Sequence, residues 1–224
     1  MKKMLLTLVA LGALLLTQTC PAAPFTPGNI AVVRVGDGAA ALSAVSAAAF
    51  IHEYTPAGVL VQVIALPAGG VAPLTLAGSS TSEGALTRSP DGKWLCVAGY
   101  RAPSGTAGIA ATTAAAFPRE VATVNVAGAV AVGPVTGTQF SGGNIRSGVT
   151  DGANNFWAGG TAVAASIPTL GGVNYLGTAS APNLVLGGNL RWVNIFNGGL
   201  YFSSGSATAS TCNWPTSGRP LKRA

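Results

Sequence analysis

Short apolar runs alternate with stretches of Gly, Pro, Asn and Asp along almost the whole chain. Runs of this kind, bounded by turn-forming residues and rich in Val, Ile and aromatic residues, predict β-strands. Alanine-rich runs at 39–41, 47–49 and 114–116 favour a helix, but Gly, Ser, Thr or Pro interrupts each, so at most one short helix is expected. The pattern therefore predicts an all-β fold. The expected strands are 30–35, 49–54, 59–66, 72–77, 84–88, 94–99, 120–126, 129–132, 145–149, 155–158, 161–166, 173–177, 183–186, 190–195 and 199–203.

One kind of turn recurs between pairs of these strands. Asp91-Gly92, Asp151-Gly152 and Asn197-Gly198 each separate two apolar runs, and such dipeptides are strong hairpin signals. The turns lie 60 and 46 residues apart, close to the roughly 40 to 50 residues of a propeller blade. Fifteen predicted strands at four per blade correspond to nearly four blades. We expect a β-propeller-like array of short antiparallel strands with about four blades, either a whole propeller or an incomplete one.

Some of these segments resemble known repeats. The segment Ser89-Pro90-Asp91-Gly92-Lys93-Trp94-Leu95 resembles the Asp-Gly turn of secreted bacterial β-propellers, and residues 53–67 resemble the strand pair of NHL and sugar-lactonase propeller repeats. Residues 25–36, 83–87 and 189–204 are similar to a group of uncharacterised exported bacterial proteins. The resemblance spans roughly residues 25–205 and implies a structural repeat. It implies no catalytic set, because propeller proteins include hydrolases, lyases, lectins and scaffolds.

The N-terminus has the pattern of a secretory signal peptide. Lys2 and Lys3 precede an apolar stretch that ends at Leu16, and small residues follow up to Ala23. We expect residues 1–22 to be the signal peptide and the protein to be secreted or periplasmic. The stretch is shorter than the about 20 apolar residues of a membrane span, so no membrane span is expected. A lipid anchor on Cys20 is the less favoured alternative, because Thr17 and Thr19 stand where a lipobox has Leu and a small residue.

The remaining chain divides into two parts. Residues 23–205 form the expected β-propeller-like domain, and residues 206–224 read as an irregular basic tail without a strand pattern. The tail is either an ordinary irregular terminus or the product of a frameshift or premature stop in a longer propeller. An open propeller leaves apolar blade faces in water, so self-association is expected if the propeller is open.

The net charge of +6 comes mainly from the two ends of the chain. Five of the 12 Lys and Arg residues lie among the first three and the last six residues, which leaves seven interior cations against six Asp and Glu. The interior cations are scattered singly and form no stripe that could follow a phosphate backbone. A nucleic-acid partner is therefore not expected.

Few residues could carry out acid–base or metal chemistry. His52 is the single histidine, and strand alternation places it beside Phe50 and Tyr54, with Glu53 on the opposite face. A packed histidine is favoured over a catalytic one, and no Gly-x-Ser-x-Gly elbow is present. The chain has no spaced Cys/His cluster and no Asp-x-Asp-x-Asp motif, so neither a metal nor a cofactor is expected.

The acidic residues and the cysteines have ordinary structural interpretations. Asp37, Asp91 and Asp151 each precede Gly, as turn-capping aspartates do. Glu83 and Glu120 have Arg88 and Arg119 nearby in sequence, which suggests simple ion pairs. Cys96 lies within an apolar run and is favoured as a small buried hydrophobic residue, while a disulfide between Cys96 and Cys212 is the alternative.

Aromatic residues follow the recurring turns. Trp94, Trp157 and Tyr201 stand just after the three turns. They are either core residues that pack between blades or platforms on which sugar rings stack, and their exposure distinguishes the two interpretations. Trp94 and Trp157 are accordingly weak candidates for a binding site, and no catalytic residue is expected.

These features favour an exported protein with a binding or structural role at the cell exterior, whose partner is an extracellular ligand or an envelope component. One alternative is an extracytoplasmic hydrolase or lyase that acts on carbohydrate or a lactone, which rests on the resemblance to propeller relatives. The other is a truncated product without activity. The chain has a single His and no cluster of acidic residues, which disfavours the hydrolase or lyase alternative.

Overall fold

The fold of the described residues is all-β, as the sequence predicts. A computed structural model describes residues 22–163, 166–177, 183–186, 188–205 and 214–215. Its strands form antiparallel sheets, and the described helical segments are one short turn of 3₁₀-helix, Ile109–Ala111, and one short helix, α1 (Ile167–Leu170). No described helix is long and apolar enough to cross a membrane.

The first sheet is built around the long strand β2 (Ser46–Tyr54), with β1 (Ile30–Val35) and β3 (Leu60–Ala65) on its two sides. In β1 the residues alternate between exposed and half-buried, as a strand with only one covered face does. A short strand, β4 (Thr75–Ala77), pairs with the N-terminal end of β2. One residue pair, Thr75 and Tyr100, joins β4 to β6 (Trp94–Tyr100), so strands β1–β8 form one eight-stranded sheet; we describe its two parts, β1–β4 and β5–β8, as the first and second sheets.

The second and third sheets are meanders of four consecutive strands. The second has the order β5 (Thr87–Arg88), β6 (Trp94–Tyr100), β7 (Arg119–Asn125) and β8 (Val130–Thr136). The third has the order β9 (Ile145–Thr150), β10 (Phe156–Gly160), β11 (Gly172–Tyr175) and β12 (Asn183–Leu186). In both meanders each strand pairs with the one before it in the chain.

The fourth sheet contains β13 (Leu190–Phe196), β14 (Gly199–Ser204) and β15 (Trp214–Pro215). Asn197 and Gly198 join β13 to β14 with φ angles of 47° and 75°. Two positive φ angles are what a tight type I′ hairpin turn requires, so the Asn-Gly turn predicted from the sequence is present.

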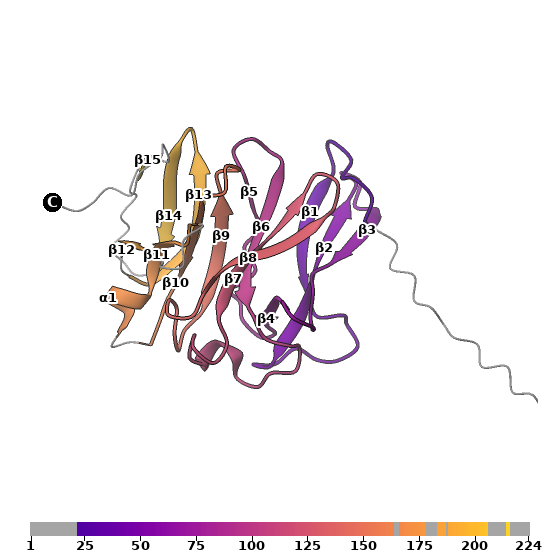
Figure 1. Cartoon of the computed structure of the whole chain (residues 1–224). Helices are drawn as coiled ribbons and strands as arrows, with labels where there is room; N and C mark the ends of the chain where they lie inside the picture. The colour runs from indigo at the N-terminus through magenta and orange to yellow at the C-terminus, as the bar shows by residue number, and fades with distance from the viewer. Residues whose placement is uncertain (1–21, 164–165, 178–182, 187, 206–213, 216–224) are drawn as a thin grey trace, which may run out of the picture.

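The sheets stack face to face in the order of the chain, from indigo to yellow in Figure 1. Three apolar cores lie between successive sheets. Ile51 and Ile64 share the first core with Val97 and Val124, and Cys96 and Ala98 share the second with Phe140 and Ile145. The third joins Val149 and Trp157 to residues of the fourth sheet, including Val193 and Ile195.

The first strands of successive sheets lie close together. Ala85, just before β5, forms an isolated parallel bridge with Ser147 of β9. The Val193 amide of β13 donates to the Ser147 hydroxyl at 3.0 Å. Ser147 therefore links the start of three consecutive sheets.

Several details differ from the sequence-based expectation: the expected strands 72–77 and 84–88 are shorter, as β4 and β5, and β2 begins three residues earlier than expected. Residues 161–163, expected to begin a strand, are not in one, and α1 follows shortly after. Strand β8 continues to Thr136 although Pro134 interrupts the apolar run; β8 pairs only with β7 in the described residues, so its outer edge needs no N–H from proline. Trp214–Pro215, in the segment expected to be an irregular tail, pairs with β14.

Candidate functional site

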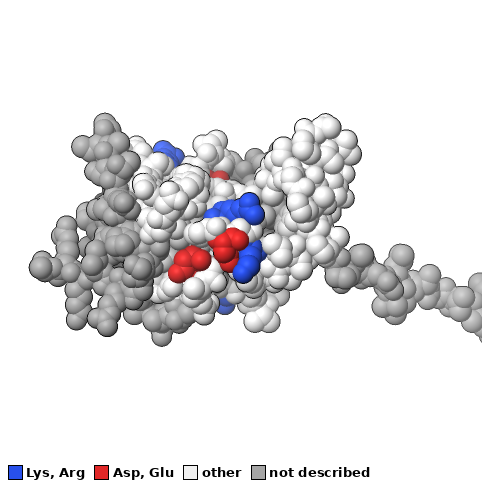
Figure 2. Space-filling view, turned by 90° about the horizontal axis from the view of Figure 1, so that it is seen from above, with Lys and Arg blue, Asp and Glu red and all other residues white. Residues whose placement is uncertain are grey.

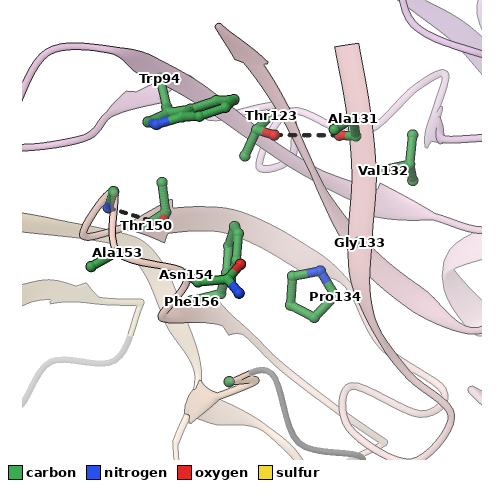
Figure 3. Close-up of a pocket in the computed structure, with 12 residues that line it drawn as sticks. Trp94, Thr123, Ala131, Val132, Gly133, Pro134, Thr150, Ala153, Asn154 and Phe156 are labelled. Carbon is green, nitrogen blue, oxygen red and sulfur yellow. Dashed lines mark hydrogen bonds between the residues drawn. The ribbon is translucent and has the colours of Figure 1, made fainter. Parts of the chain in front are cut away.

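A cavity of about 630 Å³ lies between the second and third sheets. Figure 3 shows β8 along one side and the β9–β10 turn along the other, with the Trp94 ring above them. We refer to this cavity as the groove. Its lining residues are Trp94, Thr123, Ala131, Val132, Gly133, Pro134, Thr150, Gly152, Ala153, Asn154, Phe156 and Gly177.

One wall of the groove belongs to the second sheet, and the alternation of side chains along its strands explains which residues line it. Trp94, Cys96 and Ala98 are every second residue of β6 and therefore share a face. Cys96 and Ala98 are fully buried in the second core, whereas Trp94, at the start of the strand, is half-buried and reaches the groove. Register continues this face onto the next strands, because Thr123 is paired with both Cys96 and Ala131.

The other wall of the groove is the β9–β10 turn, and hydrogen bonds within the turn fix its conformation. The Asp151 carboxylate accepts from the amides of Ala153 (2.8 Å) and Asn155 (3.2 Å) and from the Asn155 side chain (2.7 Å). The Thr150 hydroxyl accepts from the Gly152 amide at 3.1 Å, one of the dashed lines in Figure 3. The interpretation of Asp151 as a turn-capping residue agrees with these contacts. The wall is consequently preformed.

The groove has a neutral lining. Two aromatic rings, Trp94 and Phe156, stand among small residues, two threonines and one asparagine, and no Lys, Arg, Asp or Glu is among the lining residues that the structure describes. An aromatic face binds an apolar ligand surface, and hydroxyl and amide groups orient polar substituents. This arrangement suits an uncharged ligand that has both kinds of surface.

The other tryptophan candidate has a different environment. Trp157 is only 5% exposed and lies in the third core, where its ring packs at 5.3 Å from the ring of Tyr175. Its burial favours the core interpretation over a sugar platform. Because consecutive strand residues point to opposite faces, the neighbouring Phe156 lines the groove instead.

A second cavity, of about 500 Å³, shares Trp94 with the groove and lies beside the N-terminal segment 25–29. Arg88, Lys93 and Glu53 are among its lining residues. Burial opposes ionisation of Glu53, but its hydrogen bonds with Gln62 (2.6 Å), Thr26 and Asn29 together outweigh burial and hold its pKa below the ordinary value. Glu53 thus fastens the N-terminal segment to β2.

Charged side chains gather beside these cavities: a β-carbon on Gly152 of the groove lining would lie 3.0 Å from an Asp91 carboxylate oxygen. Figure 2 shows acidic and basic side chains gathered near the middle of the face seen from above, with uncharged surface around them. At the tip of the β5–β6 hairpin, Lys93 lies 3.6 Å from the Asp91 carboxylate. Asp91 also accepts from the Ser89 hydroxyl (2.6 Å) and the Lys93 amide (3.1 Å), which agrees with its expected turn-capping role.

His52 lies between Phe50 and Tyr54, as strand alternation predicts. Its Nδ1 is 3.1 Å from the Tyr54 hydroxyl. Burial, reinforced by the nearby Arg34 charge, lowers the pKa of His52, so the ring is neutral at pH 7. Glu53 is on the opposite face, and the two side chains do not act together.

A buried polar cluster, which the sequence did not reveal, lies near the ends of β6 and β7. Glu83 accepts from the Tyr100 hydroxyl (2.6 Å), the Ala77 amide (2.9 Å) and the Asn144 side chain. Burial raises the pKa of Glu83 despite these donors, and Glu83 also raises the pKa of the buried Tyr100. The partners are 17 and 61 residues away in sequence, so sequence proximity could not identify them.

The expected pairing of Glu120 with Arg119 is wrong. Glu120 pairs with Arg101, whose Nε lies 2.6 Å from its carboxylate. Arg119 is on the other face of β7, where it donates to the carbonyl groups of Phe117, Thr112 and Gly143 and lies over the Tyr100 ring. Similarly, Arg88 donates to the Gly92 carbonyl, while Glu83 belongs to the cluster around Tyr100.

In the part of the chain that the structure describes, no three His, Cys, Asp or Glu side chains come together as a metal site requires. Cys96 is fully buried and is a free thiol, while Cys20 and Cys212 lie outside the described residues. Comparisons with protein-family models, curated proteins and solved structures found no match to this chain. The groove is therefore the feature of the described residues that best indicates a function.

Proposed function

We propose that the chain is an exported binding protein of propeller-like architecture that holds a neutral glycan in the groove beside Trp94. The observation that carries the proposal is a preformed groove whose lining combines two aromatic rings with hydroxyl and amide groups and no charged residue. A volume of about 630 Å³ is within the range of small-ligand sites and accommodates one or two sugar rings.

The chemistry of the groove fits a pyranose ring. One face of a pyranose carries mainly C–H groups and stacks on an aromatic ring such as that of Trp94. Its hydroxyl groups need hydrogen-bond partners: the Asn154 amide can donate and accept, and the hydroxyls of Thr123 and Thr150, which already donate to backbone carbonyls, can still accept. No charged residue is among the described lining residues, and the Asp91 carboxylate beside Gly152 is paired with Lys93, which supports a neutral ligand.

The proposed architecture rests on the order of the strands. Two consecutive four-stranded meanders, β5–β8 and β9–β12, are packed face to face, and their first strands approach each other in parallel at Ala85 and Ser147. Blades of a propeller have this connectivity and this packing. The sheets of β1–β3 and β13–β15 would be further blades on either side.

The proposed location is the periplasm or the cell exterior. A charged start, an apolar stretch and a small-residue exit at residues 1–22 support export. A neutral glycan of the cell envelope or its surroundings is consistent with both this location and the lining of the groove.

Calorimetric titration with a panel of neutral and acidic oligosaccharides tests the proposal. Binding of a neutral member is expected, and Trp94→Ala should weaken it about tenfold or more, because losing a stacking ring costs about 1.4 kcal/mol or more. Trp94→Phe, which retains an aromatic face, should weaken it less. Val71→Ala is the control, since it removes an apolar side chain that is 97% exposed and lies outside the groove.

Two results would contradict the proposal. One is the absence of binding by every neutral oligosaccharide in the panel. The other is equal affinity of the Trp94→Ala variant and the unmodified protein for the ligand that binds. Far-UV circular dichroism and melting curves of each variant confirm that the fold persists.

A further inference from the structure

The outward face of the first sheet is largely apolar; its residues on β1 and β3 are exposed to solvent, whereas His52 at its centre is only 5% exposed. Cross-strand register defines it as three rows across β1, β2 and β3: Ile30–Tyr54–Leu60, Val32–His52–Val63 and Arg34–Phe50–Ala65. We call these nine residues the first face. Ile30 is 51% exposed and Val63 is 47% exposed. Arg34, at one end, is the single charged residue of the face and donates to the Asp37 carbonyl.

The other side of the same sheet is already buried. Ala31, Val33, Ile51 and Ile64 pack in the first core against the second sheet. A sheet with one wet face alternates apolar and polar residues, whereas a sheet covered on both faces has nearly continuous apolar strands. Strands β1 (Ile-Ala-Val-Val-Arg-Val) and β3 (Leu-Val-Gln-Val-Ile-Ala) are nearly continuous apolar runs, the pattern of a sheet covered on both faces. Their composition indicates that something covers the first face.

A second apolar face lies on the fourth sheet, the last of the stack in chain order. Register places Trp192, Asn194 and Phe196 of β13 on the same side as Tyr201 of β14. We call Trp192, Phe196 and Tyr201 the last face; Asn194 is only 8% exposed, lines the second cavity and is not part of it. Trp192 is 37% exposed and Phe196 is 49% exposed, and their rings are 6.2 Å apart. The Tyr201 ring lies 5.8 Å from that of Phe196.

The packing inside the chain indicates what fits these two faces. Each core of the molecule forms where one sheet covers the next in chain order. The first and last faces are the two sides of this series that the described residues leave exposed, and neither includes a carboxylate. We propose that a second copy of the chain covers the first face with its last face, so that the contact between copies repeats the sheet-on-sheet packing within each copy.

Such a contact joins two different surfaces and closes into a ring or continues into a longer assembly. It depends on burial of apolar area, and Arg34 is the single charged residue of the two faces. Moderate salt screens charges and leaves apolar association intact. Association should therefore not weaken between low and moderate NaCl concentrations.

Sedimentation velocity of the full chain, in the form that the expressing cells produce, tests the proposal. The unmodified protein should associate at micromolar concentration. Val63→Lys blocks the first face and Phe196→Lys blocks the last face; each should raise the dissociation constant at least tenfold. A mixture of the two variants should associate again, since each retains the face that the other lacks. Val71→Lys, at a loop position 97% exposed and outside both faces, is the matched control.

Other outcomes would overturn the proposal. If the unmodified protein stays monomeric at 100 μM, a second copy does not cover the first face and the proposal is wrong. Loss of association in Val63→Lys but not in Phe196→Lys would mean that the first face binds its own copy. Failure of the mixture to associate would exclude the first-to-last contact. Ile30→Lys serves as a second first-face variant if Val63→Lys fails to fold. Trp94 belongs to neither face, so these results are independent of glycan binding.

Discussion

Gly148 of β9 lies directly against Val121 of β7, where the third sheet packs on the second. A β-carbon on Gly148 would lie 2.8 Å from one methyl carbon of Val121 and 3.4 Å from the β-carbon of Ala98. Val121 and Ala98 are fully buried, and a β-branched side chain has little rotamer freedom with which to move away. The absence of a side chain at Gly148 therefore sets the distance between the two sheets.

Gly148→Ala should destabilise the protein by about 1–3 kcal/mol, because the extra methyl group forces the facing sheets apart. Urea denaturation should show a lower midpoint with an unchanged slope. Gly69→Ala is the control: Gly69 has an ordinary φ and nothing within 4 Å of the added carbon. That substitution should alter the free energy of unfolding by no more than about 0.5 kcal/mol. Equal midpoints for the two variants would refute the role assigned to Gly148.

The sequence pattern predicts most strands because turn residues mark where they end. The expected strand 30–35 coincides with β1, and 94–99 differs from β6 by one residue. The pattern is less successful where pairing overrides local preference. Alanines 47 and 48, in a run that favours a helix, belong to β2 because they pair with Leu76 and Thr75 of β4.

The candidate site is only partly predictable for a related reason. Aromatic residues after the recurring turns identify Trp94, but the sequence does not reveal which face of a strand another sheet covers. Phe156 and Trp157 are adjacent and equally apolar, yet Trp157 lies in the core and Phe156 lines the groove. The groove itself depends on contact between Trp94 and the turn at 150–154, which are more than 50 residues apart.

The Cys96 thiol should be inert in the folded protein. Its side chain is fully buried, and burial raises its pKa to about 12, so almost no thiolate forms at pH 8. Iodoacetamide should label the peptide that contains Cys96 only after unfolding in guanidinium chloride, as peptide mass mapping can show. Samples reduced before unfolding provide the control. Rapid labelling of the native protein, or a disulfide-linked Cys96 peptide before reduction, would contradict this expectation.

Glu120 is the buried carboxylate with the clearest consequence for stability. It is fully buried, and one of its oxygens receives the Arg101 Nε hydrogen bond while the other has no partner. Burial raises its pKa to about 7, although Arg101 acts in the opposite direction. Between its ordinary pKa of 4.5 and about 7, the folded state keeps a proton that the unfolded state releases.

The contribution of Glu120 to stability should therefore be present below pH 4.5 and lost as pH rises through about 7. Glu120→Gln keeps the acceptor for Arg101 and cannot ionise. Relative to the unmodified protein, the free energy of unfolding of this variant should increase between pH 4.5 and 7, by up to about 3 kcal/mol. Urea denaturation of both proteins across this pH range measures the difference between their free energies of unfolding. Both proteins contain Glu83 and His52, so the titration of these two residues cancels in the difference. A difference that is independent of pH would show that Glu120 has an ordinary pKa in the folded state.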